Sequence, residues 1–172
     1  LGIESQMVGG RRITDAETLK VVTMVYGGLV NKNIVAKLQA QGINALGLTG
    51  ADMNVMLSHK RPVKDVDYGF VGDVDKCDGL MLSKLISEGV VPVMAPLTHD
   101  GQGNMLNTNA DTMAGECAKG LSALFDVHLV FCFEKAGVLR DENDDDSVGP
   151  QINRATYAEL LEQGIVNGGM IH

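Results

Sequence analysis

Cysteine is scarce in this sequence of 172 residues, which contains three. Cys77, Cys117 and Cys132 are odd in number and form no C-x-x-C pair. This spacing argues against a disulfide framework and against a zinc site. We therefore expect three reduced thiols in a protein of the cytoplasm.

Long apolar runs and an excess of basic residues are also missing. No apolar stretch has the length of a transmembrane helix, and we expect neither a membrane span nor a signal peptide. The 14 lysines and arginines are outnumbered by 22 acidic residues, which gives a net charge of −8. This balance argues against nucleic acid and anionic membranes as partners. The length and a hydrophobic content of 45% predict one globular domain with a real core.

The best-known phosphate, hydrolase and metal motifs are absent as well. The sequence has no G-x-x-x-x-G-K-[ST], no G-x-S-x-G and no H-E-x-x-H. The glycines of 101–103 lack the third glycine of a dinucleotide-binding loop. The acidic run from Asp141 starts like a calcium loop, but Asp146 replaces the turn glycine and Ile152 replaces the bidentate glutamate. We interpret it as a solvated loop and expect no metal site formed by protein side chains.

Short apolar segments alternate with amphipathic ones along the chain. The Thr14–Glu17 segment has the spacing of a capping box and opens a long helix that Gly42 ends. We predict helices over 14–41, 79–87, 112–124 and 155–162, strands over 44–48, 90–95 and 128–133, a β-hairpin within 53–75 and a turn-rich stretch over 97–104. This order predicts an α/β fold, a three-layer α/β/α sandwich around a mainly parallel open sheet.

The most informative stretch is an N-x-N-x-D segment just before a helix of small residues. If the segment is extended, Asn107, Asn109 and Asp111 share one face and converge on one ligand, because alternate side chains of a strand point the same way. The helix that follows would add free backbone N–H groups and a partial positive charge. The alternative is an ordinary polar loop that ends in an aspartate N-cap.

Ligands in open α/β sheets bind outside the carboxyl ends of the strands. Three loops occupy that place in the predicted fold: Thr49-Gly50, the stretch from Pro96 and the stretch 134–137. A pair of arginines, Arg11 and Arg12, precedes the first helix, and arginine suits bidentate recognition of a carboxylate. These features together favour a site that binds an anionic small molecule and acts on it.

Eight short segments of the sequence, taken in their order along the chain, resemble the acetylglutamate kinases, a branch of the amino acid kinase family. The resemblance covers essentially the whole chain and rests on the segments 10–17, 31–32, 45–50, 69–72, 92–96, 106–111, 137–139 and 168–171. It implies the amino acid kinase fold and transfer of the γ-phosphoryl group of ATP to the side-chain carboxylate of N-acetyl-L-glutamate, a step of arginine biosynthesis.

The resemblance also implies roles for individual residues. Arg12 would clamp the α-carboxylate of the substrate, Asn107 would bind the acylglutamate, and Asn109 would lie in the same pocket. Asp111 would organise catalytic lysines. The nucleotide site would be formed by Glu134, Lys135, Ala136, Gly137, Val138, Leu139, Ile165, Val166 and Asn167, with Mg²⁺ carried by the phosphates.

Several features depart from the family pattern. A lysine and a glycine-rich loop would precede Leu1, and a second lysine would follow the final glycine pair, so we expect an incomplete kinase domain that is inactive alone. We expect residues 1–100 to hold the acylglutamate and 101–172 the nucleotide. The 51–54 segment and the Glu134-Lys135 pair resemble a bacterial branch for which N-succinylglutamate has been proposed as substrate. Its second carboxylate would require a further cation from Arg11, Lys60 or Arg61.

The sequence is also compatible with two rival functions. One is a non-catalytic module of the same fold that senses a metabolite, and the second is a related kinase that acts on free glutamate. The long helix over 14–41 carries Tyr26, Leu29 and Val30 on an apolar surface, which resembles the dimer element of the family. The same stripe is also typical of a helix that packs on its own core.

Overall fold

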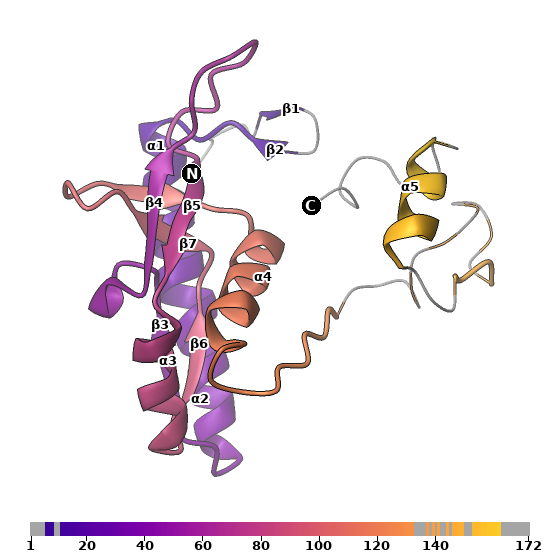
Figure 1. Cartoon of the computed structure of the whole chain (residues 1–172). Coiled ribbons are helices and arrows are strands. Elements are labelled where there is room, and N and C mark those ends of the chain that lie inside the picture. The colour runs from indigo at the N-terminus through magenta and orange to yellow at the C-terminus, as the bar shows by residue number, and fades with distance from the viewer. Residues whose placement is uncertain are drawn as a thin grey trace. The chain divides into compact units, whose positions relative to one another are not determined.

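The computed structural model describes residues 6–8, 11–132, 137, 139, 141, 144, 146–149 and 153–162. The chain divides into two compact units, Leu1–Leu129 and Val130–His172. The first unit contains β1 (Met7–Val8), β2 (Arg11–Arg12), α1 (Ala16–Val22), η1 (Thr23–Val30), α2 (Asn31–Ala40), β3 (Ala45–Leu48), η2 (Asp52–Asn54), β4 (Met56–Lys60), β5 (Gly72–Cys77), α3 (Gly79–Ser87), β6 (Val91–Met94), β7 (Leu97–His99), β8 (Met105–Asn107) and α4 (Ala110–Leu121) (Figure 1). Helix α5 (Arg154–Glu162) belongs to the second unit.

The helix predicted over 14–41 is confirmed as α1, η1 and α2, which follow one another without a break. The N-cap is Asp15, whose Oδ1 accepts a hydrogen bond of 2.7 Å from the backbone N–H of Thr18. The prediction of Thr14 as the capping residue is therefore wrong. The Thr14 hydroxyl bonds to Arg12 O and to the side chain of Asn107. Gly42 ends the helix with φ +76°, a conformation that glycine adopts without strain.

The middle of this helix is π-helical and runs along the strands. A Cβ on Gly27 would lie 3.2 Å from Leu97 Cδ1, so this glycine lets η1 approach β7 closely. Val22, Ala95 and Leu97 form a buried cluster, against which Leu19, Tyr26 and Met105 pack. Tyr26 therefore contributes to the core, which agrees with the prediction that the apolar stripe of this helix packs on its own core.

The strands form a mixed arrangement in the first unit. Strands β3 and β6 pair in parallel, and a four-stranded sheet has the order β5-β4-β7-β8, in which β4 and β7 are parallel. The predicted hairpin is confirmed as β4 and β5, which are antiparallel. The turn-rich stretch is instead a second hairpin, β7 and β8, also antiparallel. The α/β fold class is confirmed, and these two antiparallel pairs make the described sheet more mixed than predicted.

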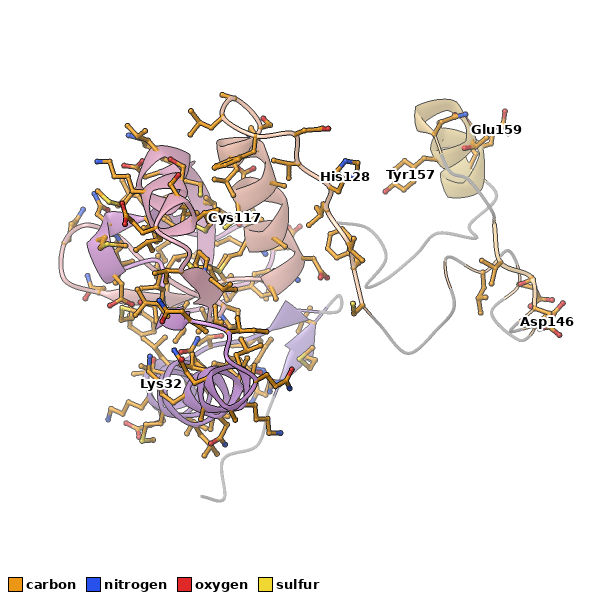
Figure 2. The ribbon with its side chains drawn as sticks, turned by 90° about the horizontal axis from the view of Figure 1, so that it is seen from below. Lys32, Cys117, His128, Asp146, Tyr157 and Glu159 are labelled. Carbon is orange, nitrogen blue, oxygen red and sulfur yellow. The ribbon has the colours of Figure 1, made fainter. Side chains whose placement is uncertain are left out.

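Helices cover both sides of the strands. Helix α2 contacts β3 and β6, whereas α3 contacts β6 and α4 contacts β5. Figure 2 shows α2, which carries Lys32, on the opposite side of the strands from α4, which carries Cys117. The first unit thus has the predicted α/β/α layers. None of the described helices has the length and apolarity needed to span a bilayer.

The strand predicted over 128–133 is wrong for its described residues. Residues 128–132 have no strand structure, and Leu129, Val130 and Phe131 are 44, 76 and 47% exposed. An apolar, β-branched segment becomes a strand only when its backbone groups pair with a neighbouring strand. In the part of the chain that the structure describes, no strand pairs with this segment.

Candidate functional site

The candidate site is built where three segments distant in sequence are joined by backbone hydrogen bonds. The N–H of Phe70 donates to Thr14 O at 2.6 Å, and the N–H of Asn107 donates to Phe70 O at 2.8 Å. One residue therefore binds both the start of the first helix and the end of β8. This junction holds Asn107 beside the segment that carries Arg12.

Gly69 is required for this close approach. Its φ is +69°, and a Cβ at this position would lie 2.2 Å from Thr14 O. That distance is far inside van der Waals contact. Any side chain at position 69 would therefore push Thr14 away from Phe70.

Asn107 bonds through its side chain as well as its backbone. Its Nδ2 donates to Thr14 Oγ1 at 3.0 Å, and Thr14 is completely buried. The Thr14 hydroxyl donates in turn to the backbone oxygen of Arg12 at 3.4 Å. The structure thus brings Arg12 and Asn107, two predicted substrate ligands, to the same threonine.

The predicted alternation holds from Leu106 to Asn109 and then stops. Leu106 and Thr108 are buried, while Asn107 and Asn109 are partly exposed. Asn109 is the N-cap of α4, because its Oδ1 accepts a 2.8 Å hydrogen bond from the N–H of Thr112.

Asp111 does not continue this face. It lies inside the first turn of α4 and is exposed, so the extended pattern predicted through Asp111 is wrong. The alternative of an aspartate N-cap is also wrong, because Asn109 takes that position. Helix α4 begins at Ala110, two residues before the predicted start, since the asparagine side chain satisfies one of its free N–H groups, that of Thr112.

A buried hydroxyl pair that sequence reasoning missed lies beneath β8. Thr98 Oγ1 and Thr108 Oγ1 are 2.8 Å apart, and both residues are buried. Gly72 makes room for this pair, because a Cβ on it would lie 2.8 Å from Thr108 Oγ1. The only signal in the sequence is a threonine at a buried position within β7 and another directly after β8.

Two of the three predicted strand-end loops lie together. The N–H of Gly50 donates to Leu97 O at 2.7 Å, which joins the loop after β3 to the start of β7. His99 Nδ1 accepts from the N–H of Gly101, so its Nε2 carries the proton and donates to Asn54 Oδ1 at 2.8 Å. Both Met53 and Asn54 have positive φ, at 51° and 54°.

In the third loop, Glu134, Lys135 and Ala136 lie outside the described residues.

The cationic side chains of the first hairpin are engaged in local contacts. The Arg61 guanidinium binds the Asp73 carboxylate through Nε and Nη2, and these hydrogen bonds raise the pKa of Arg61. Lys60 Nζ lies 5.2 Å from the centre of the Phe70 ring. The side chain of Arg11 is outside the described residues. Arg61 is therefore paired with a carboxylate of its own chain, that of Asp73.

The three thiols are free, as predicted. A hydrogen bond with Cys117, together with burial, raises the pKa of the Cys77 thiol, and the same bond lowers the pKa of Cys117. Cys117 also lines an apolar pocket of about 360 Å³ between β6, α4 and residues 127–129.

Few of the predicted nucleotide ligands fall within the described residues. Leu139 is 7% exposed and forms a bridge with Val148 in the second unit. A Cβ on Gly137 would lie 2.6 Å from Val148 Cγ1, so glycine is needed for this contact. The other nucleotide residues, Val138, Ile165, Val166 and Asn167 together with those of the third loop, lie outside the described part.

Solved structures of known proteins share this fold. The smu.665 protein of Streptococcus mutans UA159 superimposes with a TM-score of 0.84 at 26% identity, over 98% of this chain and 65% of that one. An N-acetylglutamate synthase from Neisseria gonorrhoeae, solved with coenzyme A and N-acetyl-glutamate, gives a TM-score of 0.61 over 70% of this chain and 27% of that one. Its identity of 23% supports the fold alone.

Curated relatives are more similar. A protein of Bacteroides thetaiotaomicron named acetylglutamate kinase is 78% identical over 171 residues, which are 99% of this chain and 66% of the relative. Proteins of the same name from Cytophaga hutchinsonii and Methanopyrus kandleri are 66 and 43% identical, over 65 and 70% of their lengths. The chain thus spans about two thirds of the relatives that it matches. The model of the amino acid kinase family matches residues 1–172, and the chain belongs to this family.

Proposed function

We propose that the protein phosphorylates the side-chain carboxylate of N-acetyl-L-glutamate with ATP, in arginine biosynthesis. The observation that carries this proposal is the similarity to relatives named acetylglutamate kinase, at up to 78% identity over 99% of the chain. The junction at Thr14 supports it, because the backbone oxygen of Arg12 and the side-chain amide of Asn107 bind the same hydroxyl, so the residue that carries the guanidinium and the residue that carries the amide meet at one threonine. These groups suit a substrate with a carboxylate and an acylated amine.

The reaction needs little covalent chemistry from the protein. A carboxylate oxygen of the substrate forms a bond to the γ-phosphorus, the bond from that phosphorus to the bridging oxygen breaks, and ADP leaves with the electron pair. Because the nucleophile is already ionised, no general base is required, and catalysis consists of positioning and charge neutralisation. The product is an acyl phosphate.

The proposed roles are those that the resemblance to the acetylglutamate kinases implies. Arg12 binds the α-carboxylate, Asn107 binds the acylglutamate, and Asn109 lies close by at the start of α4. Asp111, exposed in the first turn, organises the catalytic lysines of the complete protein rather than taking a proton. The division into an acylglutamate part, 1–100, and a nucleotide part, 101–172, remains a prediction.

The nucleotide and its metal belong to the same proposal. We propose that ATP contacts the segments 134–139 and 165–167, and that Mg²⁺ enters on the nucleotide phosphates, which are preferred ligands of this ion. Among the described residues, no group of three or more histidine, cysteine, aspartate or glutamate side chains gathers to hold a metal ion without such phosphates.

Trapping of the acyl phosphate with hydroxylamine tests the function. The complete protein is incubated with Mg-ATP and N-acetylglutamate, N-succinylglutamate or glutamate in parallel, and hydroxamate is measured. We expect hydroxamate with N-acetylglutamate, a strong loss in Asn107→Ala, and no loss in Asn44→Ala, the same change in an exposed loop. Product with only one of the other substrates would change the assigned substrate, and bound ATP without any product would favour a metabolite sensor.

We also propose that the complete protein is a cytoplasmic homodimer that associates through the long helix. On the described residues of this helix, Met24, Leu29, Val30 and Ile34 are 57, 62, 42 and 41% exposed. Exposed apolar groups on one helix are typical of a subunit interface. Leu29→Glu is expected to give monomers in light scattering, whereas Lys37→Glu, on the same helix, is expected to leave the dimer intact. Equal masses for wild type and Leu29→Glu would contradict this interface.

A further inference from the structure

Thr14 lies at the centre of the site although no ligand role is assigned to it. It is 0% exposed, and both of its backbone groups are engaged: its N–H donates to Tyr68 O at 2.9 Å, and its oxygen accepts from the N–H of Phe70 at 2.6 Å. Two backbone bonds and complete burial fix the position of its side chain. The hydroxyl is therefore held in one position, and a side chain that bonds to it is held in place as well.

The hydroxyl hydrogen bonds of Thr14 determine how the Asn107 amide is turned. A hydroxyl has one proton to donate, and a backbone carbonyl can only accept. The Thr14 proton is given to Arg12 O at 3.4 Å, so the lone pairs of Oγ1 are left for a donor, which is the Nδ2 group of Asn107 at 3.0 Å. The threonine thus selects the amide orientation in which nitrogen points inward.

The carbonyl oxygen of Asn107 is left available by this arrangement. Within the described residues, Asn107 Oδ1 accepts no hydrogen bond, and it is not among the buried polar atoms that lack a partner. It is therefore open to solvent and ready to accept from a ligand. A ligand group that binds there must present an N–H or O–H donor.

We propose that Thr14 is a positioning residue, which holds the Asn107 amide so that its carbonyl oxygen receives the amide N–H of the acylated substrate. This inference rests on the proposed function for the identity of the substrate. Thr14 itself touches no substrate atom and acts through Asn107. A purely structural role would instead affect folding without affecting the recognition of the acylglutamate.

Kinetics of the complete protein separate these two roles. Thr14→Val removes the hydroxyl at nearly constant volume, and Thr14→Ser restores it. We expect Thr14→Val to raise KM for N-acetylglutamate about five- to tenfold, the effect of about 1 to 1.4 kcal/mol in binding, with KM for ATP unchanged. Thr14→Ser is expected to return KM to within about twofold of the wild type, because the net contribution of one hydrogen bond is recovered.

Two further variants make the test specific. Thr98→Val removes another fully buried threonine hydroxyl, and we expect it to lower the melting temperature without changing either KM. In an Asn107→Ala background, Thr14→Val is expected to have no further effect on KM, because the group that it positions is gone. Unchanged KM in Thr14→Val, a parallel rise of both KM values, or additive effects with Asn107→Ala would overturn the proposal.

A spectroscopic measurement keeps the inference independent of catalysis. The side-chain amide resonance of Asn107 is assigned in the complete protein by its loss in Asn107→Ala. We expect one of its two protons to be protected from solvent exchange in the wild type and in Thr14→Ser, and unprotected in Thr14→Val. An absence of hydroxamate from the wild type would refute the proposed function alone, whereas equal exchange in all three proteins would refute the positioning role.

Discussion

Alanine at position 69 is expected to destabilise the protein far more than alanine at position 42. Both glycines have left-handed backbones, with φ +69° and +76°, so alanine has a similar conformational cost of about 1–2 kcal/mol at each. The two sites differ in the space around them. A Cβ on Gly42 would meet nothing within 4 Å, whereas a Cβ on Gly69 would lie 2.2 Å from the Thr14 oxygen and 2.8 Å from its carbonyl carbon.

The additional cost at position 69 comes from moving a backbone. Non-bonded heavy atoms prefer about 3.5 Å or more, so an overlap of more than about 1 Å must be relieved. The movement would break the bonds that Thr14 makes with Tyr68 and Phe70, each worth about 1 kcal/mol. We therefore expect Gly69→Ala to cost about 3–4 kcal/mol and Gly42→Ala about 1–2 kcal/mol.

Urea titration of the complete protein measures both losses as free energies of unfolding. Because Gly69→Ala displaces Thr14, it is also expected to raise KM for N-acetylglutamate in the fraction that folds, whereas Gly42→Ala leaves this KM unchanged. Equal losses of stability at the two positions, or an unchanged KM in Gly69→Ala, would refute the idea that this contact builds the site.

Two helix starts give further predictions. Asn109→Ala removes the cap of α4 and is expected to cost about 1 kcal/mol in urea titration, whereas Asn109→Asp keeps the accepting oxygen and most of the stability. Equal losses in the two variants would contradict the role of that oxygen. At Asp15, hydrogen bonds from the backbone and side chain of Thr18 lower the pKa of the carboxyl from 3.8. The ionised cap therefore contributes stability above pH 3.8, and this contribution is lost as the pH falls through the lower pKa of the folded state. Asp15→Asn, which does not titrate, is expected to show a weaker loss of stability in acid, and an identical acid transition would contradict this.

The sequence predicts the elements that are determined by local signals. The long first helix, the helix 79–87 and the hairpin near 53–75 are all found where periodicity, caps and glycines indicate them. Gly42 and Gly89 end their helices with positive φ, as their places after the apolar pattern suggest. Such signals act within a few residues, so they are visible in one sequence.

Features that depend on distant segments were missed or predicted incorrectly. Periodicity gives no hint that β7 and β8 form a hairpin, since each has three residues. The apolar stretch 128–132 has the composition of a strand but no described partner. Local apolar patterns do not specify which strand supplies the hydrogen bonds.

The candidate site is itself a prediction, and the sequence indicates only part of its arrangement. The chemistry of Arg12, Asn107 and Asn109, together with the family resemblance, predicts them as substrate ligands, and the structure joins the backbone of Arg12 and the side chain of Asn107 to one threonine. The sequence predicts that the Thr14 hydroxyl caps the helix, because a local partner at the spacing of a capping box is the simplest expectation. The structure gives it two other partners, the nearby backbone oxygen of Arg12 and the side chain of Asn107, which is 93 residues away in the sequence. A contact over that distance becomes visible only in the fold.

The dependence of turnover on N-acetylglutamate concentration, compared between wild type and Asn107→Ala, tests the central claim most directly. The complete proteins are assayed at saturating Mg-ATP, with Asn44→Ala as the matched control. We predict ADP formation that requires N-acetylglutamate, a KM raised about ten- to hundredfold in Asn107→Ala by the loss of hydrogen bonds to a charged substrate, and a wild-type curve for Asn44→Ala. Superimposable curves for wild type and Asn107→Ala, or ADP formation independent of N-acetylglutamate, would contradict it.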